Sequence, residues 1–289
     1  MVQIITDSSA LITRAEGEEM GIEVIPLRVN ILDEEFRDLE VDLDHFYGQI
    51  NKGGVPRSSQ PPIGEFVEAY NKYAGQKMVN IAMADGLSGT YQSACSAKEM
   101  VKHIDNITVF NTKTLCGPQR YMVLKAQQMK EEGKTAQEIM EWLEASIQKT
   151  ESFLIPQDFG FLRRGGRLTP VAAALGSALK LKPIMTLTEN GDKLDIFSIK
   201  RTMKSAVGAV ISHLQKRDLD DRHILYISHA NAPEDAENVR ALLAEAFPKL
   251  ELEILELGAL AAVGALSRPG ATEGMKMEKE LREYVGKFE

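Results

Sequence analysis

The sequence predicts a two-domain α/β protein, and three observations support this. The chain has 289 residues, 44% of them apolar, which is enough for two domains with separate cores. In the first half, short apolar runs alternate with segments of helical spacing, which favours three layers around a mostly parallel sheet. From about Glu151 the pattern changes to strands that include a hairpin. We therefore expect an N-terminal α/β domain over residues 1–152 and a C-terminal α+β domain with a mixed sheet over residues 153–289.

The elements of the N-terminal domain follow from apolar runs and helical spacing. A strand over residues 2–6 leads into a capping-type turn, and a strand over residues 22–32 is bent or placed at an edge by Pro26. Residues 54–62, rich in Gly and Pro, form a loop. Further strands are expected over 77–83 and 106–112, and helices over 63–74, 90–103, 113–133 and 135–149, the last with Thr135 and Glu138 in capping-box spacing.

The C-terminal domain is predicted in the same way. Asn190-Gly191 between two apolar runs predicts a hairpin over residues 183–200 with a type I′ turn. The low-charge run over residues 168–181 predicts a core helix. Strands are expected over 152–156, 223–229 and 250–257, and helices over 202–216 and 233–247.

Composition excludes several classes of function. The net charge of −8 and the pI near 5.4 argue against nucleic-acid binding. The two cysteines, Cys95 and Cys116, form neither a disulfide framework nor a metal motif, and the five histidines show no ligand spacing. The N-terminus lacks the pattern of a signal peptide, and no apolar run is long enough to span a membrane. We expect a cytoplasmic protein with no metal, no cofactor and no integral membrane segment.

The segment "GLSGT", Gly86 to Thr90, lies between a predicted strand and a predicted helix. Free N–H groups and the positive end of the helix dipole would face this loop, Ser88 and Thr90 add hydroxyl donors, and Gly89 lets a ligand approach the backbone. The segment has neither the Lys-Ser/Thr pair of a Walker A loop nor the second glycine of a nucleophile elbow. It suits an anion cradle, although on spacing alone an ordinary turn with a serine cap is the favoured interpretation.

The segment "RSSQPP" places Ser58 and Ser59 just before a predicted helix, in a loop stiffened by two prolines. These hydroxyl groups can serve a ligand or cap the helix. In "FLRRGGRLTP", Arg167 follows a Gly-Gly pair, and an arginine there can bind a carboxylate or phosphate with two hydrogen bonds. The alternative is a solvated basic turn.

The segment "TDSS", which contains Asp7 and Ser8, ends the first strand at the edge where ligands of open α/β sheets bind. Asp7 could act as an acid–base group, although a helix cap is the favoured interpretation. An enzyme hypothesis therefore stays open, in which a small-molecule phosphotransferase or hydrolase uses Asp7 as base or nucleophile. A regulatory module is a third possibility, but the acidic charge argues against DNA binding.

Taken together, these motifs resemble the DegV family of bacterial fatty-acid-binding proteins. The resemblance covers nearly the whole chain and rests on "IITDSS", "SSQPP", "GLSGTYQSA", "FLRRGGRLT" and "LKLKP", in that order. It implies two α/β domains with an acyl chain buried between or beneath them. It also implies that the protein is not an enzyme and presents a long-chain fatty acid to a separate fatty acid kinase, which makes an acyl phosphate for phospholipid synthesis.

The resemblance also assigns residues. Ser58 and Ser59 stand at the Thr and Ser of the family's "TSQP" loop, Ser88 at the Ser of "GLSG", and Arg167 at the Arg of "GGR", close to the head group. The expected carboxylate ligands are thus Ser58, Ser59, Ser88, Gly89 and Arg167; further possible ligands are Asp7, Ser8, Asp85, Thr90 and Arg268.

The sequence shows three departures from the family pattern, the first at Ala84 and Asp85, where the family has two small hydroxyl residues. Asp85 replaces a small hydroxyl residue, and an ionised Asp85 at ~4 Å from a bound carboxylate would cost a few kcal/mol at an effective dielectric of about 20, unless it points to solvent. Leu266 stands where the family has a His, and Arg268 could supply a compensating positive charge. Ser58 in place of Thr keeps the hydroxyl group.

Overall fold

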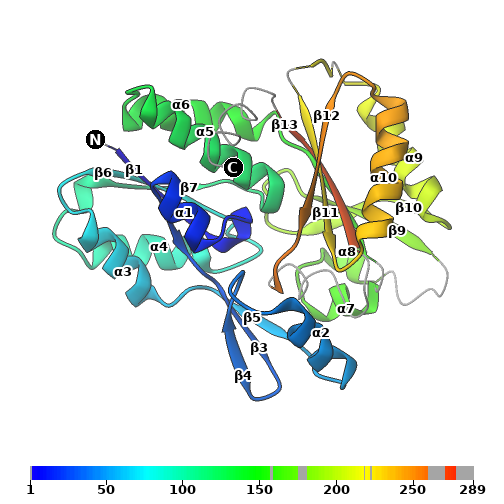
Figure 1. Cartoon of the computed structure of the whole chain (residues 1–289), viewed down its shortest axis with the longest axis horizontal. Coiled ribbons are helices and arrows are strands. Elements are labelled where there is room, and N and C mark those ends of the chain that lie inside the picture. The colour runs from blue at the N-terminus through cyan, green and yellow to red at the C-terminus, as the bar shows by residue number, and fades with distance from the viewer. Residues whose placement is uncertain are drawn as a thin grey trace. The chain divides into compact units, whose positions relative to one another are not determined.

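The computed structural model describes residues 2–156, 159–174, 181–217, 219–221, 223–259 and 271–277. These residues form two compact units, one ending at Lys149 and the other beginning at Thr150 (Figure 1). The sequence places the division a few residues later, after residue 152.

The first unit contains a four-stranded parallel sheet with the strand order β2-β1-β6-β7. β1 is buried along its whole length, as expected of a central strand between two helical layers. α3 and α4 cover one face through Phe66, Tyr70 and Ala94, and α5 and α6 lie over the other (Figure 1). The strands are β1 (Val2–Asp7), β2 (Ile22–Ile25), β6 (Lys77–Ala82) and β7 (Ile107–Asn111), and the helices are α1 (Arg14–Met20), α3 (Ile63–Lys72), α4 (Thr90–Glu99), α5 (Cys116–Glu131) and α6 (Ala136–Ile147), with short 3₁₀ turns η1 (Ser8–Ala10) and η2 (Ile104–Asn106).

This layered architecture confirms the predicted three-layer α/β domain. The four expected helices and the strands expected over residues 2–6, 77–83 and 106–112 are present, with ends that differ by a few residues, whereas α1 was not expected. The capping box of Thr135 and Glu138 is formed at the start of α6.

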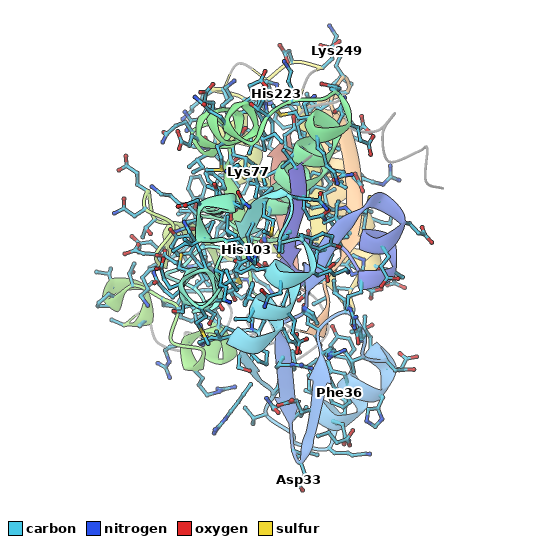
Figure 2. The ribbon with its side chains drawn as sticks, turned by 90° about the vertical axis from the view of Figure 1, so that its left-hand side faces the viewer. Asp33, Phe36, Lys77, His103, His223 and Lys249 are labelled. Carbon is cyan, nitrogen blue, oxygen red and sulfur yellow. The ribbon has the colours of Figure 1, made fainter. Side chains whose placement is uncertain are left out.

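A three-stranded antiparallel sheet, here called the arm, corrects two predictions in this unit. The arm has the strand order β4-β3-β5 and consists of β3 (Arg28–Ile31), β4 (Glu34–Arg37) and β5 (Arg57–Ser59), with α2 (Leu43–Asn51) between β4 and β5. The single strand expected over residues 22–32 is wrong: Pro26, which has no N–H to donate, separates β2 from β3. The loop expected over residues 54–62 contains β5. The β3–β4 hairpin carries Asp33 at its tip (Figure 2).

The second unit contains a six-stranded sheet with the order β10-β9-β8-β13-β11-β12. The pair β11–β12 is parallel and the other neighbours are antiparallel, which confirms the predicted mixed sheet. α9 and α10 cover one face. The elements are β8 (Ser152–Ile155), α7 (Phe159–Arg164), α8 (Pro170–Ala173), β9 (Lys182–Leu187), β10 (Leu194–Lys200), α9 (Met203–Leu214), β11 (Ile224–Ala230), α10 (Pro233–Ala246), β12 (Glu251–Glu256) and β13 (Ala271–Met277).

Three features of this unit differ from the sequence prediction or extend it. β13, which pairs with β8 and β11, was not expected. The β9–β10 hairpin exists, but its turn is longer than a type I′ turn, and Thr188 Oγ1 accepts the N–H groups of Asp192 and Lys193, each at 3.2 Å. Gly191 alone has a positive φ there, at 71°. Of the core helix expected over 168–181, α8 is described, and residues 175–180 lie outside the described residues.

Gly17 is required where α1 packs on β2. A Cβ atom at Gly17 would lie 2.7 Å from Val24 Cγ2 and 2.8 Å from the Ile22 carbonyl oxygen, whereas nothing lies within 4 Å of the same position at Gly48 in α2. We expect Gly17→Ala to lower the free energy of unfolding by about 1–3 kcal/mol through overpacking. The control Gly48→Ala should raise it by about 0.5–1 kcal/mol through helix propensity. Urea denaturation of both variants measures this, and an equal gain in stability in both would contradict the close packing at Gly17.

Candidate functional site

The candidate site lies in the first unit, at the carboxyl ends of its parallel strands. Ligands of open α/β sheets bind at this edge because the loops that follow the strands gather there. β1 is followed by Ser8 and Ser9, β2 leads into the arm, and β6 leads into the loop that carries Ser88.

The loop after β6 is a compact turn that ends at the N-terminus of α4. The N–H groups of Leu87 and Ser88 donate to the Ala84 carbonyl at 3.1 and 3.3 Å. α4 then begins after Gly89, which has no side chain to cap it. The first N–H groups of α4 and the positive end of its dipole are therefore available to an anion.

Gly89 brings the two predicted hydroxyl-bearing segments together. A Cβ atom at Gly89 would lie 2.8 Å from Gln60 Oε1, so the Gln60 side chain rests directly on the Gly89 backbone. Gln60 follows Ser59, the last residue of β5, and Ser58 and Ser59 pair with Val29 and Arg28 of β3. Among the described residues, neither serine hydroxyl has a hydrogen-bond partner, so both are available to a ligand.

The hydroxyl groups of Ser88 and Thr90 are paired, with their oxygens 2.8 Å apart. One of them donates to the other, which leaves one hydroxyl proton for another acceptor. Thr90 is fully buried and Ser88 is half-buried. When Thr90 donates to Ser88, the Ser88 proton is free to bind an anion in front of α4.

Asp7 is buried beneath this loop, with an exposed fraction of 1%. Its Oδ2 accepts the Met83 N–H at 2.9 Å and the Gln119 Nε2 at 3.2 Å, and its Oδ1 accepts the Ser9 N–H at 3.0 Å. The last bond confirms Asp7 as a cap, here of the turn η1. A residue enclosed in this way does not present a base or nucleophile to a substrate, so the geometry gives the enzyme hypothesis no support.

The burial of Asp7 and its hydrogen bonds act in opposite directions on its pKa. Burial raises the pKa of Asp7 above its ordinary value, although hydrogen bonds from Ser9, Met83 and Gln119 oppose the shift. Ser9 Oγ contacts both Asp7 Oδ1 and Gln119 Oε1, the latter at 2.6 Å. The Ser9 hydroxyl has one proton for these two oxygens, and a proton on Asp7 supplies the missing bond.

Ser8 is also committed inside the unit. Its Oγ donates to Asp38 Oδ2 at 2.8 Å and accepts the Leu27 N–H at 3.1 Å, and it is fully buried. The structure therefore places Ser8 next to the site but uses its hydroxyl group to hold the arm.

Asp85 lies in the same loop as Ser88 and is half-buried. Its negative charge reaches the first turns of α4: burial raises the pKa of Tyr91 and of Cys95, and the charge of Asp85 adds to both shifts. The departure at Asp85 thus introduces a negative charge near α4.

Arg167 belongs to the second unit. α7 ends at Arg164, Gly166 adopts a left-handed φ of 74°, and the exposed Arg167 side chain donates to the Gly165 carbonyl. The Leu194 N–H donates to the Arg167 carbonyl at 2.9 Å, which ties this turn to β10. Leu266 and Arg268 lie outside the described residues.

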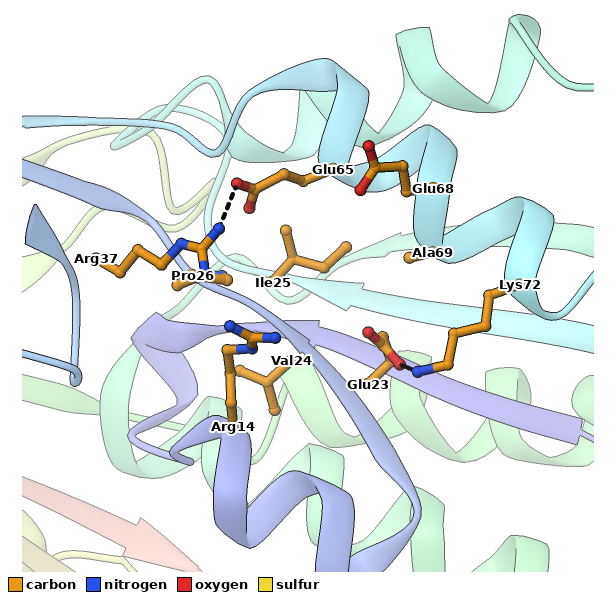
Figure 3. Close-up of a pocket in the computed structure, with 10 residues that line it drawn as sticks. All are labelled: Arg14, Glu23, Val24, Ile25, Pro26, Arg37, Glu65, Glu68, Ala69 and Lys72. Carbon is orange, nitrogen blue, oxygen red and sulfur yellow. Dashed lines mark hydrogen bonds and ion pairs between the residues drawn. The ribbon is translucent and has the colours of Figure 1, made fainter.

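The first unit also has an open, charged pocket with a volume of about 390 Å³ (Figure 3). The Lys72 ammonium group contacts Glu23 at 2.6 Å, and Arg37 contacts Glu65 at 3.5 Å. Glu65 also pairs with Arg28, which stands opposite Ser59 in the arm. Residues from α1, β2, β4 and α3 line the pocket: Arg14, Glu23, Val24, Ile25, Pro26, Arg37, Glu65, Glu68, Ala69 and Lys72.

The described residues show neither a membrane-spanning helix nor a cluster of metal-ligating side chains. No helix among them is both long and apolar enough to cross a bilayer. They also contain no group of three His, Cys, Asp or Glu side chains arranged to hold a metal ion.

The fold and site define a class: a two-unit α/β protein in which hydroxyl groups from two segments lie near a helix N-terminus. Comparison with known proteins narrows this class. The chain belongs to the DegV family, because the model described as "Uncharacterised protein, DegV family COG1307" matches residues 1–271.

Similar sequences and solved structures also belong to DegV proteins. Protein DegV of Bacillus subtilis is 32% identical over 267 residues, covering 90% of this chain and 93% of that protein. Its crystal structure, described as that of a fatty acid binding protein, matches with a TM-score of 0.83 over 96% of this chain and 99% of that one, at 30% identity. A fatty acid binding DegV family protein of Streptococcus agalactiae matches with a TM-score of 0.86 and 26% identity, over 97% and 99% of the two chains. Both of these structures are thus described as those of fatty-acid-binding proteins.

Sequence reasoning missed several residues of this site. Gln60, Ser9, Asp38 and Gln119 were not proposed, although Gln60 and Ser9 lie within motifs singled out above. An amide directly before two prolines was the one available signal for Gln60. Gln119 lies 112 residues from Asp7, and no local pattern predicts that contact.

The raised pKa of Asp7 predicts a pH dependence of stability. A raised folded-state pKa contributes stability that is fully present below the ordinary value of 3.8 and is lost as the pH rises through the folded-state pKa. Asp7→Asn has no such titration. We therefore expect the free energy of unfolding of the wild type, relative to Asp7→Asn, to fall as the pH rises above 3.8. Urea denaturation over a pH series measures the difference; an increase with pH would show that Asp7 is ionised.

Proposed function

We propose that this chain binds a long-chain fatty acid, holds its carboxylate with Ser58, Ser59, Ser88 and Gly89, and presents it to a separate fatty acid kinase. The observation that carries the proposal is the contact of Gln60 with Gly89, because it places β5 beside the N-terminus of α4. Hydroxyl and N–H donors without a metal suit a single negative charge. Relatives described as fatty acid binding share this fold.

The remaining parts of the proposal follow from the family pattern. Burial of the acyl chain provides about 0.8 kcal/mol per methylene group, so few polar contacts are needed. The family pattern assigns Arg167 to the head group, and in this proposal the protein acts in the cytoplasm as a binding subunit without chemistry of its own. The ligand of one relative, from Ruminococcus gnavus, is vaccenic acid, which is a long-chain fatty acid.

Native mass spectrometry of the purified protein, followed by organic extraction and lipid analysis, tests the ligand class. We expect one fatty acid per chain, released on denaturation. An empty chain, or one that carries another small anion, would contradict the proposal and point to a changed site at Asp85.

Ser88→Ala tests the carboxylate contact. A hydrogen bond to a charged group contributes about 1.5–3 kcal/mol, so we expect fatty-acid affinity to fall about ten- to a hundredfold with an unchanged melting temperature. Ser212→Ala is the control, because Ser212 lies on α9 and bonds only the Gly208 carbonyl of its own helix. Binding is measured by displacement of a fluorescent fatty acid. Full retention of affinity in Ser88→Ala would count against the assignment.

Gly89→Ala tests the contact between the two loops. The added Cβ would displace Gln60, whose flexible amide can move away without disturbing the backbone. We expect the melting temperature to stay near that of the wild type while fatty-acid affinity falls severalfold. Gly64→Ala on α3, where nothing lies within 4 Å of the added Cβ, should leave the affinity unchanged and should not lower the melting temperature. A Gly89→Ala protein with wild-type affinity would show that the loops need not touch.

A further inference from the structure

The end of β1 is the place from which both hydroxyl-bearing segments can be held. β1 lies between β2 and β6 in the parallel sheet. β2 leads into the arm with Ser58 and Ser59, and β6 leads into the loop with Ser88. The consecutive residues Asp7 and Ser8 stand at this end.

Asp7 holds the start of the Ser88 loop. Its Oδ2 accepts the N–H of Met83, the first residue after β6, at 2.9 Å. The next N–H, of Ala84, donates to the Thr114 carbonyl at 2.8 Å, and the Ala84 carbonyl then accepts the Ser88 N–H. Asp7 and the Thr114 carbonyl thus hold two consecutive residues at the start of the loop, and the Ser88 N–H is bonded to the second of them.

Ser8 holds the root of the arm. Its hydroxyl group bonds both Leu27 and Asp38, and the Asp38 N–H donates to the Leu27 carbonyl at 2.9 Å. Leu27 and Asp38 therefore form the rung that precedes the pair Arg28–Arg37. Ser59 stands opposite Arg28, one residue from that rung. Continuing the same register places Gln60 level with Leu27.

Neither residue is placed to touch a ligand itself. The exposed fraction is 1% for Asp7 and 0% for Ser8, and the polar atoms of both are bonded within the unit. Their effect on a ligand has to pass through the loops that they hold.

We propose that Asp7 and Ser8 are the positioning residues of the carboxylate site: Asp7 sets the place of Ser88 through Met83, and Ser8 sets the place of Ser58 and Ser59 through Leu27 and Asp38. This proposal rests on the function proposed above. Asp7 and Ser8 are joined by a single peptide unit. This unit therefore sets the distance between Ser88 and the pair Ser58 and Ser59.

Hydrogen exchange of the ligand-free full chain tests the positioning directly. We expect Asp7→Ala to speed amide exchange in residues 83–90 and to leave residues 27–38 unchanged. Ser8→Ala should speed exchange in residues 27–38 and 57–60 and leave 83–90 unchanged. Asp7→Asn keeps an oxygen for the Met83 N–H and should restore slow exchange in its loop.

Gln3→Ala is the matched control. Gln3 is buried at the opposite end of β1, and its Nε2 donates to the Gly21 carbonyl at 3.0 Å. It removes a buried hydrogen bond of the same strand without reaching either loop, so exchange in residues 83–90 and 57–60 should match the wild type.

Affinity for oleate, measured after lipid removal, shows whether the positions matter for binding. We expect Asp7→Ala to weaken binding about tenfold in the wild type but less than about twofold in a Ser88→Ala background, because positions that act through one residue are not additive. Ser8→Ala should likewise weaken binding about tenfold in the wild type and less than about twofold in a Ser58→Ala background. Gln3→Ala should bind as the wild type does.

Uniform exchange across the sheet, or exchange equal to that of the wild type, would overturn the positioning roles. Equal losses of affinity in the wild-type and Ser88→Ala backgrounds would do so as well. A wild-type chain that binds no fatty acid would refute the proposed function instead, and the exchange pattern alone would then decide whether Asp7 and Ser8 fix the two loops.

Discussion

A buried carboxyl group must be satisfied by hydrogen bonds, and Asp7 imposes this requirement on the first unit. Its oxygens contact the turn after β1, the segment after β6 and Gln119 on α5. Three parts of the chain that are distant in sequence are thereby fixed at one end of the sheet. Among the described residues no cation contacts Asp7, so these parts are held together by hydrogen bonds alone. A hydrogen-bonded cluster of this kind is directional and specifies one arrangement of its members.

Much of the fold could be predicted because the burial of one face of a helix or strand determines the spacing of its apolar residues. β1, β6 and the long helices α5 and α6 have apolar patterns that only one kind of element explains. The arm was not predicted because its strands are short and half-exposed, as in β4. In addition, the chain turns at Leu32, whose φ is 53°, and leucine is not a residue type that predicts a positive φ. β13 contains Gly274 and charged residues, which argue against a central strand when read locally.

The candidate residues of the site could be predicted from the sequence, but the hydrogen bonds between them could not. Hydroxyl residues before a helix identify Ser88 and Ser58 as candidates, and the strand end identifies Asp7 and Ser8. Whether a residue can contact a ligand or holds other residues in place depends on contacts between residues far apart in the chain, such as that of Ser8 with Asp38. A sequence pattern does not contain these contacts. Burial separates the residues that can meet a ligand from those that hold others in place. Asp85 remains the departure from the family pattern that the described structure places beside the cradle.

The close approach of Gln60 to Gly89 has a consequence for the evolution of this family. A side chain at position 89 and a long amide at position 60 compete for the same space, so each position limits what the other can accept. Substitutions there should be correlated among descendants of this sequence: a lineage that loses the glycine keeps its fold but has to move or shorten the side chain at position 60. The neighbouring prolines restrict the backbone from yielding instead. Positions 60 and 89, 29 residues apart in the chain, are therefore expected to co-vary.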